Sequence, residues 1–181
     1  MLTLQVVHDS SLHSNNTILS SSEWKHLWKL KIPPKIRVFL WRAILNALHC
    51  LDNLVRRGIA QEAVCPCCHL TDESLMHLLF YCPYVEPIWF GSAVAFHPRQ
   101  LGATCFVEWW RYIKHAAKQM QAPSLVEYCA IISWHVWKTG NEKLFEHAEI
   151  SPHQDLGRIQ AMTQEYISSS KTDFLAAPSK P

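Results

Sequence analysis

The stretch Cys65-Pro-Cys-Cys68, followed by His77 and Cys82, decides how this chain folds. Its spacing is Cys-x2-Cys-x8-His-x4-Cys. The first pair of cysteines can reach one ion from a tight turn, and a histidine and a cysteine one short helix later can complete the shell. Three thiolates and one imidazole suit tetrahedral zinc in a structural site, which has no open position for water or substrate. The spacing therefore predicts a structural Zn2+ held by Cys65, Cys68, His77 and Cys82.

Two neighbouring residues are rivals for this ligand set. Cys67 lies between two predicted ligands and competes with Cys68, and His69 is a weaker rival to His77. A helix predicted over residues 73–81 carries His77. Pro83 pushes the residue before it out of the helical region, so Cys82 can turn back toward His77. The remaining cysteines are expected to be small buried hydrophobes: Cys50, Cys105 and Cys129.

The flanks of this motif carry a family resemblance. Upstream runs Trp28-Lys-Leu-Lys-Ile-Pro-Pro-Lys-Ile-Arg-Val-Phe-Leu-Trp-Arg42, then Asn53-Leu-Val-Arg-Arg-Gly58, and Asp72-Glu-Ser-Leu-Met-His-Leu-Leu-Phe80 lies between the ligands. Over roughly residues 24–89 this order resembles the reverse-transcriptase zinc-binding domain of plant LINE-type non-LTR retrotransposons. The resemblance implies a fragment of a polyprotein that supports the polymerase on RNA or DNA, with reverse transcriptase and RNase H regions beside it in an intact element.

A weaker resemblance to the same polyproteins lies downstream, in Trp134-His-Val-Trp-Lys-Thr-Gly-Asn-Glu-Lys-Leu-Phe145. There Gly140 stands where an arginine is usual. The departure removes a charge and puts a residue that weakens helices by about 1 kcal/mol in the middle of a predicted helix. The role of this position is therefore open.

Positive charge is concentrated just before the zinc motif. The chain has a formal net charge of only +2, yet residues 23–64 hold eight basic and three acidic residues, a surplus of +5. Trp28, Phe39 and Trp41 alternate with these cations, and such a pattern can neutralise phosphates and stack on bases. The alternative is that the aromatic residues belong to the core and the cations form a solvated rim. The candidates for contact with RNA or single-stranded DNA are Lys29, Lys31, Lys35, Arg37 and Arg42.

Several protein classes are not supported by the sequence. An odd count of seven cysteines, no signal peptide and no membrane-length apolar run predict an intracellular protein of the nucleus or cytoplasm, not secreted and without a membrane partner. Phosphate-binding loops, hydrolase nucleophile elbows and the clustered acids of a polymerase or RNase H are missing, so we expect no enzyme.

Two alternative functions stay open. A helical protein–protein interaction module with a structural zinc would be favoured if Trp109, Trp110 and Trp134 formed one exposed patch. A hydrolytic zinc enzyme would need an open coordination position and a nearby carboxylate, for which Glu73 is the candidate.

The chain is expected to be mainly α, with a small zinc-stabilised helical domain followed by a helical hairpin or bundle. With 49% hydrophobic and 18% charged residues, a packed core is expected. Capping boxes at Ser20–Glu23 and Ser124–Glu127 open two of the helices. The predicted helices are 20–31, 34–48, 51–58, 73–81, 105–119, 124–147 and 151–168. The predicted organisation is a poorly ordered lead-in with a short strand (1–19), the zinc-binding domain (20–90), a linker (91–103), a helical region (104–170) and a tail (171–181).

Overall fold

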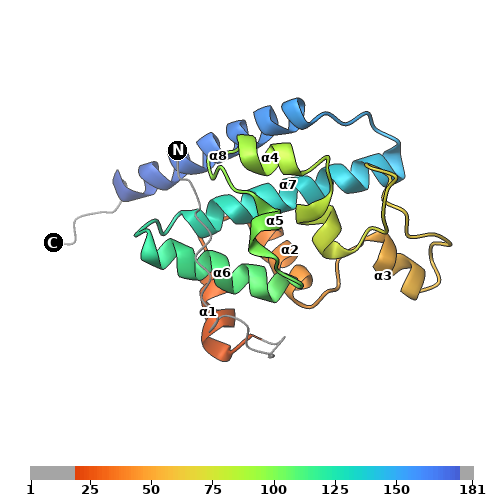
Figure 1. Ribbon diagram of the computed structural model, residues 1–181. Coiled ribbons are helices and arrows are strands. Elements are labelled where there is room, and N and C mark those ends of the chain that lie inside the picture. The colour runs from red at the N-terminus through yellow and green to blue at the C-terminus, as the bar shows by residue number, and fades with distance from the viewer. Residues whose placement is uncertain (1–18, 176–181) are drawn as a thin grey trace.

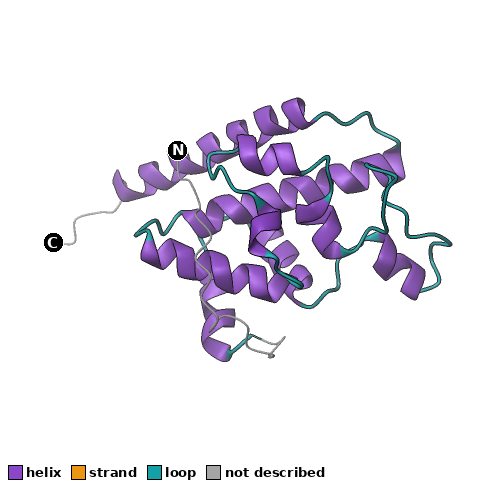
Figure 2. Ribbon diagram, viewed as in Figure 1, coloured by secondary structure: helices purple, strands orange, loops and turns teal. Residues whose placement is uncertain are grey.

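The structure, a computed structural model, describes residues 19–175, with side chains in the last helix described to residue 166. Within this range the regular secondary structure is helical, as Figure 2 shows, so the prediction of a mainly α chain is confirmed. The short strand expected in the lead-in lies outside the described residues. The elements are α1 (Ser21–Lys29), α2 (Pro34–Ile44), α3 (Leu51–Arg56), the π-helical turn η2 (His77–Tyr81), α4 (Glu86–Gly91), α5 (Pro98–Leu101), α6 (Phe106–Gln119), α7 (Leu125–Glu146) and α8 (Pro152–Leu175).

The first two helices begin and end where local chemistry dictates. Ser20 and Glu23 form the predicted capping box, with each side chain accepting from the other residue's backbone N–H. Pro33 and Pro34 separate the helices, and Pro34 is the first residue of α2. The guanidinium of Arg37 donates to the Leu30 carbonyl at 3.1 Å, which satisfies a backbone acceptor at the end of α1.

Helix α7 lies in the middle of the molecule (Figure 1) and contacts α2, α6, α8 and η2. Buried hydrophobic residues from both halves of the chain join one cluster that runs from Leu19 to Ile159. One face of α2 is part of it, since Ile36 and Leu40, four positions apart, have no exposed surface. The zinc-motif segment and the downstream helices therefore share a core.

A cluster of aromatic rings joins the end of the zinc motif to α6. The ring centroid of Phe80 lies 4.7 Å from that of Trp109, and Trp89 lies 5.9 Å from the same ring. The indole N–H of Trp89 donates to the Leu79 carbonyl at 2.7 Å. Phe96, from the segment expected to be a linker, packs against Trp89 at 5.9 Å and is fully buried.

A buried polar network ties α8 to α7 and to the zinc motif. The carboxylate of Asp155, with 1% of its surface exposed, accepts from Tyr84 at 2.5 Å and Thr139 at 3.2 Å, and lies 3.3 Å from His135 Nε2. Burial opposes ionisation of Asp155, but the hydrogen bonds from His135 and Tyr84 lower its pKa below the ordinary value. Asp155 is therefore a charged anchor inside the fold.

Some local expectations were wrong. Ser124 makes no side-chain cap, although α7 begins at Leu125 beside it. Helix α2 ends at Ile44, four residues before the predicted end, because Asn46 adopts a left-handed φ of 49°. The end of α3 follows expectation, since the helix ends at Arg56 and Gly58 just beyond its C-cap takes a left-handed φ of 70°. No helix in the described range is both long and apolar enough to cross a membrane.

Candidate metal centre

The first two cysteines of the motif lie on a tight turn between paired backbone segments. Val64 and Asp72 form an antiparallel bridge, and the Cys65 N–H donates to the Thr71 carbonyl at 2.9 Å. Inside this frame the His69 N–H donates to the Cys65 carbonyl at 2.9 Å, and His69 takes a left-handed φ of 56°. The turn presents the thiols of Cys65 and Cys68 toward η2.

The other two residues of the motif come from the turn η2 and its end. The Cys82 N–H donates to the His77 carbonyl at 2.9 Å, the five-residue span of a π turn. Cys82 then leaves the helical region with φ −66° and ψ 131°, as its place before Pro83 requires. On a regular α-helix these two side chains would point in different directions. The wide turn and the extended Cys82 bring them to the same side.

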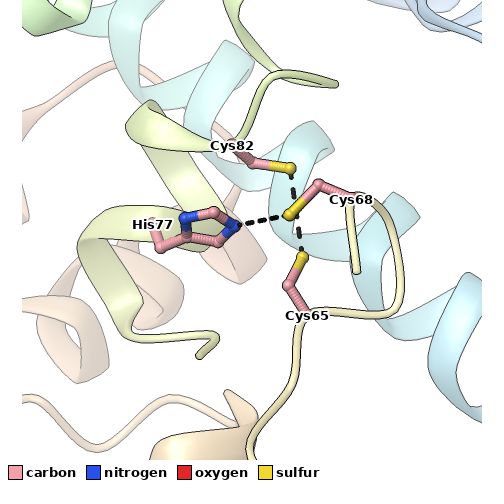
Figure 3. Close-up of side chains that lie close together, drawn as sticks. All are labelled: Cys65, Cys68, His77 and Cys82. Atoms are coloured by element: carbon pink, nitrogen blue, oxygen red, sulfur yellow. Dashed lines mark hydrogen bonds between the residues drawn. The ribbon is translucent and has the colours of Figure 1, made fainter. Parts of the chain in front are cut away.

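The four side chains converge, as Figure 3 shows. Their ligand atoms all lie within 4.8 Å of one another. The Sγ atoms of Cys65 and Cys82 are 3.9 Å apart, and Cys68 Sγ lies 3.4 Å from His77 Nε2. A zinc ion bound at about 2.3 Å by thiolates and about 2.0 Å by imidazole places neighbouring ligand atoms roughly 3.5–3.8 Å apart in a tetrahedron. The donor set and its spacing thus fit a zinc ion.

The rivals considered for the motif lie elsewhere. Cys67 is partly exposed, and His69 is exposed; neither belongs to the group of converging ligand atoms. The Cys67 side chain remains close enough to hydrogen-bond the Cys65 thiol, which lowers the pKa of Cys65. Hydrogen bonding to Cys65 in turn raises the pKa values of Cys67 and Cys82. These thiols cannot all ionise together unless a cation balances their charge.

Hydrogen bonds around the four residues fix their orientation. Thr71 Oγ1 lies 3.1 Å from His77 Nδ1, leaving Nε2 to face the thiols. The His77 backbone N–H donates to Ser74 Oγ at 3.1 Å. Such partners orient metal-binding imidazoles in many proteins. Thr71 and Ser74 were missed in the sequence, because the metal spacing carries no signal for the groups that support the ligands.

Glu73, the carboxylate considered for hydrolytic chemistry, accepts a hydrogen bond at the start of a helix. Glu73 is buried, and its Oε1 accepts from the Leu51 N–H at 3.1 Å, at the start of α3. Burial raises the pKa of Glu73 to about 7. The carboxyl therefore serves α3 as a capping group instead of standing open to water.

The predicted cationic candidates divide into two kinds. Lys29, Lys31, Lys35 and Arg42 are exposed on and between α1 and α2, whereas Arg37 is half-buried and bonded to Leu30. The Lys35 ammonium lies 4.5 Å from the centre of the Trp134 ring. Two of the three aromatic candidates are accessible: Trp28 and Trp41 are 46% and 39% exposed, while Phe39 belongs to the core.

The patch that would favour a protein-binding module is not formed. Trp109 and Trp110 are buried, at 1% and 0% exposure, and Trp134 is half-buried beneath Lys35. These three tryptophans therefore pack in or against the core and do not form an exposed patch.

Comparison with known proteins agrees with the geometry. Residues 7–89 match the family model described as zinc-binding in reverse transcriptase, which confirms the resemblance seen in the sequence. A protein of Arabidopsis thaliana named "Putative ribonuclease H protein" is 33% identical over 63 residues, which cover 35% of this chain. The aligned part is only 10% of that plant protein's length. No solved structure matches the chain.

Proposed function

We propose that this chain is a non-catalytic zinc-binding fragment of a retrotransposon-type reverse transcriptase polyprotein. The observation that carries the proposal is the convergence of Cys65, Cys68, His77 and Cys82 within 4.8 Å in a segment that matches this family. The ion would hold the turn of residues 65–68 against η2. Because four protein ligands close a tetrahedral shell, the ion has no position for substrate and its role is structural.

The test is the metal content of the purified full chain, measured by mass spectrometry together with substitutions. One zinc per chain is expected. Cys65→Ser, Cys68→Ser, His77→Ala and Cys82→Ser should each abolish stoichiometric zinc. Cys67→Ser is the matched control, since it removes a thiol from the same turn and should leave zinc bound. Zinc lost with Cys67 but retained without Cys68 would show that the wrong thiol was chosen.

For the native role, we propose weak binding of single-stranded RNA or DNA by the surface of α1 and α2. Support comes from exposed lysines beside two exposed indoles, Trp28 and Trp41, which can neutralise phosphates and stack on bases. Arg37 drops to a structural role in this proposal, because its guanidinium already bonds the Leu30 carbonyl.

The salt dependence of binding to a fluorescent single strand tests this surface. Each neutralised phosphate contributes about 0.7 to the slope of log affinity against log salt, so Lys31→Ala, Lys35→Ala and Arg42→Ala together should flatten the slope by up to about 2. The matched control replaces three basic residues elsewhere, Arg57, Lys118 and Lys143, and should change the slope less. Equal effects of the two triple variants would leave only general charge attraction and remove the surface from the proposal.

A further inference from the structure

A groove of about 500 Å³ lies between α1, α6 and the start of α7, away from the four converging ligands. Apolar side chains form most of its wall: Leu30, Ala117, Pro123 and Val126. Five polar or charged residues complete the lining: His26, Lys114, Lys118, Gln121 and Glu127. A largely apolar concavity of this size with a few polar groups is typical of a small-molecule site.

Positive charge collects along one edge of this groove. Arg111, Lys114 and Lys118 recur on α6 at spacings of three and four, which places them on one helical face. Glu23 Oε1 forms ion pairs with Arg111 Nε at 3.5 Å and with Lys114 Nζ at 3.1 Å. No carboxylate in the described part of the chain pairs with Lys118. The edge therefore carries an unbalanced cation at Lys118.

One acid, Glu127, also lines this groove. Burial raises the pKa of Glu127, so this carboxyl keeps its proton to a higher pH than an exposed glutamate. Its Oε2 is buried and has no hydrogen-bond partner among the described residues. On the other wall, burial and the nearby Lys114 charge lower the pKa of His26.

We propose that this groove binds a small amphiphilic carboxylate, its aliphatic body against Leu30, Ala117 and Val126 and its carboxylate beside Lys118. The apolar wall matches the body, and the unbalanced cation matches the head group. A stacked nucleobase fits poorly, because the only aromatic ring in the lining is the polar imidazole of His26. The proposal is independent of zinc binding and of the α1–α2 nucleic-acid surface.

The experiment titrates the isotope-labelled, zinc-loaded full chain with decanoate, decanol and decyltrimethylammonium below their micelle concentrations, and follows backbone amide shifts by NMR. The probes share a ten-carbon chain and differ in head-group charge. We expect saturable shifts confined to α1, α6 and the start of α7. Decanoate should bind about two- to five-fold more tightly than decanol, which is the range for one partly exposed charge contact. Decyltrimethylammonium should bind most weakly.

Two variants separate the apolar body from the charge. Ala117→Phe should fill the groove and abolish the shifts for every probe. Lys118→Glu, a change at an exposed position, should remove the preference for decanoate over decanol even if Ala117→Phe fails to fold. Arg57→Glu is the charge control and should leave all three affinities unchanged. Equal binding of the three probes to the unmodified chain, shifts spread over the whole surface, or no saturable shift in the groove would each overturn the proposal.

Discussion

Removing the Asp155 carboxylate should destabilise the whole fold. Asp155 lies far along the chain from the zinc motif, but its hydrogen bonds connect α8 to α7 and to the residues just after that motif. Asp155→Ala takes away the acceptor shared by Tyr84, His135 and Thr139. His135 and Thr139 are 6% and 2% exposed, so water cannot replace the lost partner. Tyr84 is partly exposed and can turn its hydroxyl to solvent.

The size of the effect follows from this difference in burial. Each buried donor left without a partner costs about 1–3 kcal/mol, and two such donors remain. Hydrogen bonds to a charged acceptor such as the ionised Asp155 carboxylate are worth about 1.5–3 kcal/mol each, so the two buried ones give a similar total. We therefore expect Asp155→Ala to lower the free energy of unfolding by about 3–5 kcal/mol. Asp155→Asn keeps the shape and one acceptor oxygen and should cost about half as much.

Urea denaturation of the zinc-loaded chain at neutral pH measures these free energies. Glu165→Ala is the matched control, because it removes an exposed carboxylate from the same helix, α8. It should change the free energy of unfolding by less than about 0.5 kcal/mol. If Asp155→Ala cost no more than this control, the network would not be an anchor, and the reasoning from burial would be refuted.

Three further predictions concern other parts of the fold. A Cβ at Gly140 would lie 2.7 Å from Leu78 Cδ1, so Gly140→Ala should lower the free energy of unfolding despite a gain in helix propensity of about 1 kcal/mol. In a Leu78→Ala background the same substitution should raise the free energy of unfolding. An effect of the same sign in both backgrounds would argue against this contact. Hydrogen bonds from Ser20 and Lys114 outweigh burial and lower the pKa of Glu23 from 4.5 to about 2. Ionised Glu23 therefore stabilises the fold fully above pH 4.5, and the stability deficit of Glu23→Gln should be constant there and shrink as the pH falls toward 2; a deficit that grows on acidification would contradict this. A chelator should remove amide protection over residues 60–85 while α7 keeps its helical circular dichroism, because the metal's binding free energy orders the motif itself; unchanged protection in this segment would mean that it folds without metal.

Local sequence signals predicted the parts of the fold that local chemistry controls. The capping box at Ser20 and Glu23 and the helix start at Pro34 depend on residues within one turn of each other. The spacing of the four candidate ligands is equally local, since all lie within 18 positions of the chain. For such features the sequence contains both partners of each interaction side by side.

Features that depend on distant partners could not be predicted. In the sequence, Gly140 in place of the usual arginine indicated only a lost charge and a lower helix propensity. In the structure, Leu78 occupies the space that a side chain at position 140 would need. The bond from Tyr84 to Asp155 spans 71 positions. The π turn at His77 was also missed, because helical periodicity does not distinguish it from an α-helix over so few residues.

The two halves of the chain are coupled through residues next to the candidate ligands. Leu78 follows His77 and packs on Gly140 of α7, while Tyr84 lies two positions after Cys82 and bonds Asp155 of α8. A metal that fixes His77 and Cys82 therefore also fixes two contacts that hold the segment of residues 77–84 against the long helices. Loss of metal should release this packing even where α7 stays helical, so secondary structure and tertiary contacts in the downstream half should respond to zinc differently.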